Sequence, residues 1–126
     1  MQKQVVVSEK VPKPIGPYSP ATILGDLVFV AGQGPLKPGT TELARGTIEE
    51  ETERVLENIK AILEAAGSSM DKVLKTTVFM ADLNDFGRMN GVYAKYFPKD
   101  PPARSTVQVA RLPLDIQVEI ECIAHR

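Results

Sequence analysis

The sequence predicts an α/β domain of the α+β kind, with a single mixed β-sheet and two helices on one of its faces. Three observations support this fold class. A capping box opens a long amphipathic segment at Thr47, runs of β-branched residues lie before and after that segment, and two more such runs end the chain. With 126 residues and no internal repeat, the chain suits one domain over residues 1–126.

The expected strands are short apolar or β-branched runs between turn signals. Gly25 and Asp26 separate two such runs and predict a hairpin. The first run, which is short and lies next to a proline-rich stretch, is expected at an edge of the sheet. Strands are expected at residues 4–7, 21–24, 27–31, 73–80, 105–110 and 116–123.

Apolar residues at helical spacing predict the two helices. The first begins at the N-cap Thr47, whose capping-box partner is Glu50, and ends at Gly67. The second follows the turn at residues 82–85 and is stopped by Pro98. Its aromatic residues share the helical spacing, which favours core packing over a ligand box: Phe86, Tyr93, Tyr96 and Phe97.

The expected strand at residues 27–31 is apolar at every position. Because alternate residues of a strand point to opposite faces, both of its faces are apolar, as in strands that are buried on both sides. Two helices cover only one face of a sheet, and the chain has no further element for the other. We therefore expect a homo-oligomer that buries the second face.

Composition argues against several classes of partner. The net charge is −1 and the basic residues are scattered, whereas a nucleic-acid-binding protein usually carries a basic face. No apolar run approaches the roughly 20 residues needed to cross a bilayer, and the N-terminus lacks the apolar stretch of a signal peptide. With Cys122 as its only cysteine, the chain forms no internal disulfide, and a cytoplasmic protein is expected.

Nucleophilic and metal chemistry find little support in the sequence. Cys122 and His125 are three residues apart in an expected strand, so their side chains point to opposite faces and do not meet. Cys122 also falls on the apolar face of that strand, which predicts a core residue. One histidine and one cysteine form no metal-binding cluster.

A guanidinium and a carboxylate remain as candidate site groups. Arg104 lies where a proline-rich loop enters a strand, and Glu119 and Glu121 share one face of the last strand. Such a pair could hold a small organic acid and direct a water molecule at it. From the pattern alone, a surface or structural ion pair is the better explanation of Arg104, and a solvated strand face is the better explanation of the two glutamates. Tyr18 lies in the loop at residues 8–20, whose prolines stiffen it; a polyproline ligand is the alternative for that loop.

The chain resembles the Rid family, the reactive intermediate deaminases also called YjgF-like proteins, and within it the RidA branch. No single motif carries the resemblance; many short matches occur in order along the whole chain. They lie at residues 15–19 (IGPYS), 30–33 (VAGQ), 58–67 (NIKAILEAAG), 75–79 (KTTVF), 82–86 (DLNDF), 90–93 (NGVY), 102–105 (PARS), 109–113 (VARLP) and 119–121 (EIE).

The resemblance implies a chorismate-mutase-like fold that forms a homotrimer, with three sheets as an inner barrel and the active sites between subunits. The implied activity is that of a 2-iminobutanoate/2-iminopropanoate deaminase. It hydrolyses reactive 2-imino acids, which pyridoxal-phosphate enzymes release, to 2-keto acids and ammonia. The resemblance implies neither a metal nor an organic cofactor.

The resemblance also assigns roles to residues. Arg104 matches the arginine that binds the substrate carboxylate, a task for which the planar guanidinium suits better than lysine. Glu119 matches the glutamate that holds the attacking water, and Glu121 is the alternative. Tyr18 matches a loop tyrosine at the cleft.

Three further matches line the implied site: the backbones of Gly32 and Thr106, and Asn90 on the second helix. Many RidA members carry Cys where this chain has Thr106 and Ser where it has Ala31. The first difference matters little if the site uses the backbone. The second removes a hydroxyl and could alter which imines fit.

Two other functions stay open at this stage. A protein with the same fold could bind small carboxylates without catalysis, although binding alone needs only Arg104. An RNA-acting translation inhibitor is the second alternative, and the net charge and the absence of a histidine pair weigh against it.

Overall fold

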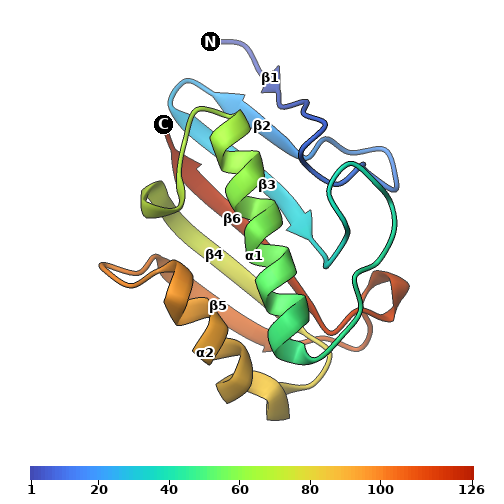
Figure 1. Cartoon of the computed structure of the whole chain (residues 1–126). Helices are drawn as coiled ribbons and strands as arrows, with labels where there is room; N and C mark the ends of the chain where they lie inside the picture. The colour runs from blue at the N-terminus through green and yellow to red at the C-terminus, as the bar shows by residue number, and fades with distance from the viewer.

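The computed structural model describes all of residues 1–126 and contains one six-stranded sheet and two α-helices (Figure 1). The fold class predicted from the sequence is confirmed. The strands are β1 (Gln4–Val5), β2 (Ala21–Leu24), β3 (Leu27–Gln33), β4 (Val73–Met80), β5 (Ala103–Gln108) and β6 (Val118–His125), and the helices are α1 (Ile48–Ala65) and α2 (Phe86–Tyr96).

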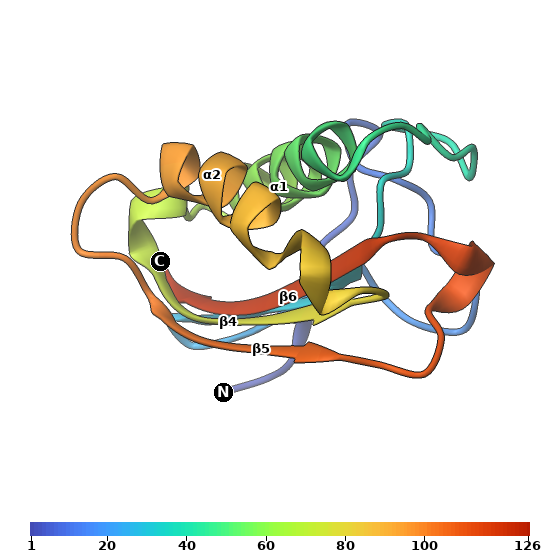
Figure 2. The same ribbon diagram turned by 90° about the horizontal axis from the view of Figure 1, so that it is seen from below.

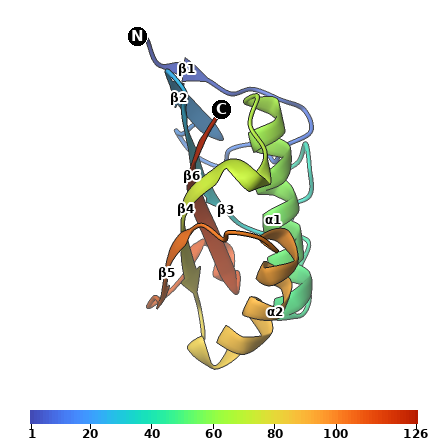
Figure 3. The ribbon, with the colours of Figure 1, turned by 90° about the vertical axis from the view of Figure 1, so that its left-hand side faces the viewer.

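The strand order across the sheet is β1-β2-β3-β6-β4-β5, so the last strand of the chain lies near the middle. Only β4 and β5 pair in parallel; every other neighbouring pair is antiparallel. Both helices pack on one face of the sheet and the other face is open (Figures 2 and 3). Neither helix has the length and apolar character that a membrane crossing requires.

Local signals set the first helix as the sequence predicts. The side chain of Thr47 accepts from the backbone N–H of Glu50 at 3.1 Å, and the Glu50 carboxylate accepts from the N–H of Thr47 at 3.0 Å. Helix α1 then ends at a cap on Ala66, followed by Gly67 with φ +80°. The apolar stripe between these ends is buried against the sheet, at Val55, Leu56, Ile59, Ile62 and Leu63.

The last two strands lie at different bounds from those predicted. Strand β5 begins at Ala103 rather than Ser105, because Ala103 and Arg104 already pair with β4. Strand β6 begins at Val118 rather than Ile116, because a turn at Pro113–Asp115 intervenes. Glu51 fixes this start: its buried carboxylate accepts from the backbone N–H of Gln117 at 3.0 Å.

Strand β3 has one buried face and one open face within a single chain. Val28 is 0% exposed under the helices, whereas Leu27 and Phe29 on the opposite face are 41% and 40% exposed. Within one chain the second face of β3 is therefore not buried, and its burial by another copy stays a prediction. Near its end, β3 shifts register against β6 between Val30 and Gln33, so the strand continues two residues beyond the predicted end at Ala31.

Candidate active site

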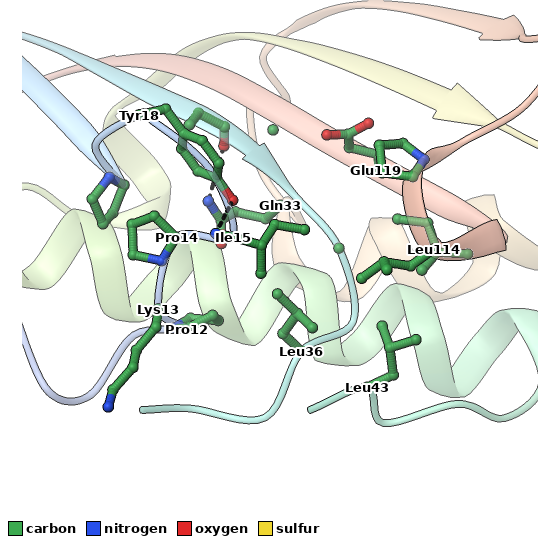
Figure 4. A pocket seen from close by; sticks show the side chains of 16 residues that line it. Pro12, Lys13, Pro14, Ile15, Tyr18, Gln33, Leu36, Leu43, Leu114 and Glu119 are labelled. Carbon is green, nitrogen blue, oxygen red and sulfur yellow. Dashed lines mark hydrogen bonds between the residues drawn. The ribbon is translucent and has the colours of Figure 1, made fainter. Parts of the chain in front are cut away.

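A cavity of about 260 Å³ opens where the proline-rich loop meets the end of β3. Its other walls come from the loop after β3 and from the turn before β6. Figure 4 shows Tyr18 at one end of the cavity and Glu119 with Leu114 at the other. The residues that line the cavity include Tyr18, Gly32, Gln33, Pro113, Leu114, Ile116 and Glu119.

Glu119 is the only carboxylate in the cavity wall. It lies on β6 between the buried residues Val118 and Ile120, so its side chain points to the open face of the sheet, as predicted. Burial raises the pKa of the Glu119 carboxyl above its ordinary value, and the nearby negative charge of Glu121 raises this pKa further. A carboxyl whose pKa is raised toward neutrality suits proton transfer. Glu121, two residues on, is exposed and does not line the cavity.

The absence of a side chain at Gly32 leaves the space that the Glu119 carboxylate occupies. A Cβ added at residue 32 would lie 2.3 Å from Oε1 and 2.9 Å from Cδ of Glu119. Because real Cβ atoms do not approach other atoms so closely, any side chain here would push the carboxylate away. Gly32 lies within the segment where the register of β3 against β6 shifts, between Val30 and Gln33.

We expect Gly32→Ala to lower activity at the site by about tenfold or more, because a misplacement of about 1 Å in a catalytic group can cost 10²-fold. The folded state should largely survive, since the clash is with the movable end of a side chain. Thermal unfolding and the activity assay described below would separate the two effects. The matched control is Gly91→Ala, where an added Cβ meets nothing within 4 Å. Unchanged activity in Gly32→Ala would show that the position of the Glu119 carboxylate does not depend on a glycine at residue 32.

Tyr18 shapes the opposite end of the cavity. Its hydroxyl accepts from the backbone N–H of Ile15 at 3.2 Å, which closes a tight turn within the proline-rich loop. The ring is 44% exposed and lines the cavity together with Gln33. The loop therefore presents a fixed aromatic face, as the sequence predicts, and not an extended ligand for another domain.

Arg104 lies on the other face of the sheet. Thr76 pairs with both Arg104 and Cys122, and Cys122 belongs to the buried, helix-facing set of β6. The Arg104 guanidinium stacks on two rings of α2, with its carbon 4.7 Å from the Tyr93 centroid and 5.5 Å from the Phe86 centroid. No carboxylate of the chain forms an ion pair with it. A partly buried guanidinium has the planar geometry that can bind a carboxylate bidentately.

The ring under Arg104 is itself held in place. The Tyr93 hydroxyl shares a buried hydrogen bond of 2.7 Å with Thr76, and burial raises the pKa of the Tyr93 phenol. The aromatic stripe of α2 thus has a second role besides packing. Sequence reasoning assigned Phe86 and Tyr93 to the core alone, because nothing in the sequence shows that α2 lies over β5.

Two polar atoms on β5 and α2 are buried without a hydrogen-bond partner. They are Oγ1 of Thr106, two residues after Arg104 on β5, and Oδ1 of Asn90, which has helical spacing to Phe86 and Tyr93 on α2. Buried polar atoms are nearly always satisfied, so each such exception needs an explanation. Both atoms lie on the two elements that carry Arg104 and the rings under its guanidinium. Arg104, Thr106 and Asn90 therefore form a second cluster of the predicted site residues.

The predicted site residues fall into two groups within one chain. The first, on the open face, contains Tyr18, Gly32 and Glu119; the second, on the helix face, contains Asn90, Arg104 and Thr106. The chain does not bring Arg104 to Glu119, because the two strand positions point to opposite faces of the sheet. A site that uses both groups must draw them from two copies.

Cys122 and His125 stay outside both groups. Cys122 is 4% exposed, and burial raises the pKa of its thiol to about 12, so it carries no thiolate near neutral pH. His125 is exposed beside the end of the chain. The prediction of a core cysteine is confirmed.

The sequence profile of a family described as endoribonuclease L-PSP matches residues 8–126. A protein of Pyrococcus abyssi, named as a RutC family protein, is 55% identical over 126 residues, which is 100% of this chain and 99% of the relative. Reactive Intermediate Deaminase A of Arabidopsis thaliana is 49% identical and aligns over 98% of this chain and 66% of its own length.

Among solved structures, E. coli TdcF with bound serine superposes with a TM-score of 0.92 at 44% identity and 98% coverage of both chains. The fold and these matches define a small α/β protein of the L-PSP type. The chain belongs to this family, which is also called the Rid or YjgF-like family. The resemblance noted in the sequence is confirmed.

Proposed function

We propose that this protein hydrolyses 2-imino acids to 2-keto acids and ammonia, at a site that two neighbouring copies complete. The observation that carries the proposal is Arg104, a guanidinium held between two aromatic rings with no anion of its own chain. The carboxylate of a small organic acid fits it bidentately.

The second half of the chemistry falls to Glu119. As a carboxylate it takes a proton from a water molecule while the water oxygen bonds to the imine carbon, and the π electrons of the C=N bond move to nitrogen. The protonated Glu119 then returns the proton to that nitrogen. The hydroxyl proton then passes through Glu119 to the amino nitrogen as the C–N bond breaks, which leaves a 2-keto acid and ammonia. Burial raises the pKa of Glu119, which makes its carboxylate a stronger base for the first step.

Two relatives support this choice of substrate class. One is named a reactive intermediate deaminase, and E. coli TdcF is described with bound serine. Serine carries a carboxylate and an α-nitrogen, the two groups that a 2-imino acid also presents. In this chain the unpartnered oxygens of Thr106 and Asn90 lie on the two elements that carry Arg104 and the rings under its guanidinium, where they could accept from or orient such a ligand.

The open sheet face is the proposed surface between copies, in a homotrimer. Its exposed apolar residues include Leu27 and Phe29, whose burial would stabilise an oligomer. We expect Phe29→Glu to give a single chain of 13.8 kDa by light scattering and to lose activity, because the two residue groups would separate. Val7→Glu, an equally apolar exposed position in the N-terminal segment, is the control. A wild-type chain that is monomeric at micromolar concentration would contradict the proposal.

A subunit-mixing experiment tests whether the site is shared. Arg104→Ala and Glu119→Gln should each be inactive alone. Co-refolded in equal amounts, they should recover about one quarter of wild-type activity, because in a cyclic oligomer about one site in four draws both intact groups from different chains. If Arg104 and Glu119 of one chain shared a site, every mixed site would lack one group and no activity would return.

The reaction itself is tested by supplying the imine. A threonine dehydratase generates 2-iminobutanoate in situ, and semicarbazide traps what remains. Adding this protein should lower the trapped fraction, and the Arg104→Ala variant should not. If the wild type has no effect across several 2-imino acids but still binds 2-keto acids, the site is a carboxylate-binding site without catalysis.

The family description names a second candidate, endoribonuclease activity. Cleavage of RNA at a 2′-hydroxyl needs a general acid and a general base near one phosphate. The only histidine, His125, lies at the end of β6, and its ring contacts the backbone oxygen of Arg126. Incubation of the protein with a labelled RNA tests this candidate. Cleavage that Arg104→Ala and Glu119→Gln both abolish would favour the nuclease over the deaminase.

A further inference from the structure

The turn between β5 and β6 carries two consecutive residues with left-handed backbone that are not glycine. Leu114 has φ 59° and ψ 15°, and Asp115 has φ 55°. Aspartate tolerates this conformation because its short polar side chain can hydrogen-bond locally. Leucine has no such compensation, so the strain is concentrated at Leu114. Other interactions must hold the turn in this shape.

Arg45 supplies them. Its guanidinium donates to the backbone oxygen of Leu114 at 2.5 Å and to that of Asp115 at 3.3 Å. Arg111 adds a bidentate ion pair with the Asp115 carboxylate, at 2.7 and 3.0 Å. Arg45 lies in the loop after β3, whose residues Leu36 and Leu43 form another wall of the cavity. It therefore ties two walls of the same cavity together.

The strained turn presents the Leu114 side chain at the cavity. Leu114 is 47% exposed and lines the wall beside Pro113 and Ile116, at the same end as Glu119 (Figure 4). An apolar side chain that stays exposed next to a carboxylate contributes little to the core. It is placed to contact a hydrocarbon group on a molecule that reacts at Glu119.

We propose that Leu114 is a specificity-determining residue for the side chain of the imino acid, and that Arg45 is the positioning residue that holds it there. This inference rests on the proposed function. The chain then favours 2-imino acids with a branched or extended apolar side chain over the one with a methyl group. A methyl group on a substrate whose carbon lies at Glu119 is too short to use the Leu114 wall, whereas longer side chains gain contact with it.

The test compares two substrates. An L-amino-acid oxidase produces the imino acids of alanine and of leucine, and the ratio of their kcat/KM values measures side-chain preference. Leu114→Gly should lower the ratio of kcat/KM for the leucine-derived imine to kcat/KM for the alanine-derived imine about tenfold, the low end of what a methylene contributes in an apolar pocket. Because glycine adopts the left-handed conformation freely, the melting temperature should not fall.

Arg45→Met separates positioning from general stability. It removes the donors that hold the turn and should lower the same ratio. In the Leu114→Gly background it should have no further effect on the ratio, since Arg45 acts through the leucine side chain. An equal effect in both backgrounds would overturn the role of Arg45, and an unchanged ratio in Leu114→Gly would overturn the whole inference.

Binding keeps this test apart from the proposed function. If the wild type hydrolyses neither imine, the proposed function fails, and the affinities for 2-oxopropanoate and 4-methyl-2-oxopentanoate by calorimetry replace the kinetic ratio. The same loss of preference in Leu114→Gly would then support Leu114 as a wall of a binding site. If the wild type binds neither keto acid, or binds both equally, the inference about Leu114 is wrong.

Discussion

Arg104→Lys is expected to lower kcat/KM for imine hydrolysis roughly 10- to 150-fold. This range corresponds to about 1.5–3 kcal/mol for hydrogen bonds to a charged group. Lysine keeps the positive charge but cannot form two parallel hydrogen bonds to a carboxylate, and it does not stack flat on Tyr93 and Phe86. The loss should appear mainly in KM, if the carboxylate is bound equally in the ground state and the transition state.

The control for this variant is Arg88→Lys. Arg88 lies on α2, and unlike Arg104 it forms ion pairs on the surface: its guanidinium lies 2.7 Å from Glu49 and 3.6 Å from Asp85. The Arg88→Lys variant should therefore leave kcat/KM for imine hydrolysis unchanged. Full activity in Arg104→Lys would mean that a point charge suffices, and full activity in Arg104→Ala would remove the arginine from the site altogether.

Glu119→Gln is expected to lower kcat about 10²- to 10⁴-fold, the usual contribution of general acid–base catalysis. Glutamine keeps the shape of the side chain against Gly32 but cannot carry the proton. Glu121→Gln provides the discriminating comparison, because Glu121 shares the face of β6 yet stays outside the cavity. Loss of activity in the second variant instead of the first would move the catalytic role to Glu121.

The Glu119→Gln substitution should also stabilise the folded protein at neutral pH. Burial raises the pKa of Glu119 above its ordinary value of 4.5 in the folded state. As the pH rises past the ordinary value, the unfolded chain releases its proton first, so folding loses stability until the pH exceeds the folded pKa. Glutamine does not ionise and avoids this loss. The melting temperature of Glu119→Gln should therefore exceed that of the wild type at pH 7.

The pH dependence of the difference in melting temperature between Glu119→Gln and the wild type is the more decisive measurement. At about pH 4 and below, Glu119 is largely protonated in both the folded and the unfolded state, so the two melting temperatures should converge. A difference that stays constant from pH 4 to 7 would mean that packing, and not the charge, distinguishes the variant. A variant less stable than the wild type at pH 7 would show that the ionised carboxylate is well compensated in the native protein.

Local sequence determined most of the secondary structure. The capping box at Thr47, the Gly25-Asp26 turn and the β-branched run at residues 73–80 act through neighbouring residues, so their elements could be read directly. The alternation in β6 likewise fixed the core role of Cys122 and the outward direction of Glu119. The bounds of β5 and β6 differ by about two residues from the predicted ones, because both depend on distant residues. Strand β5 already pairs with β4 at Ala103, and Arg45 contacts the turn before β6 from 69 residues earlier.

The types of residue in the candidate site were also accessible from the sequence, through their match to the family, but their grouping was not. Tyr93 and Phe86 have the helical spacing of core residues. Only the packing of α2 over β5 shows that their rings also contact the Arg104 guanidinium. Leu114 and Arg45 carry no sequence signal at all. Side chains that act through packing across elements leave no pattern along the chain.

The elements, the helix-facing sides of the strands and the family thus follow from patterns along the chain. The position of β6, the last strand, between β3 and β4 follows from long-range pairing in the folded molecule. The pairing of β4 with both β5 and β6 then places Arg104 on the helix-facing side of the sheet, opposite to the side on which Glu119 lies. The physical reason is that a strand alternates its side chains with period two, while strand order depends on long-range pairing that no local pattern encodes.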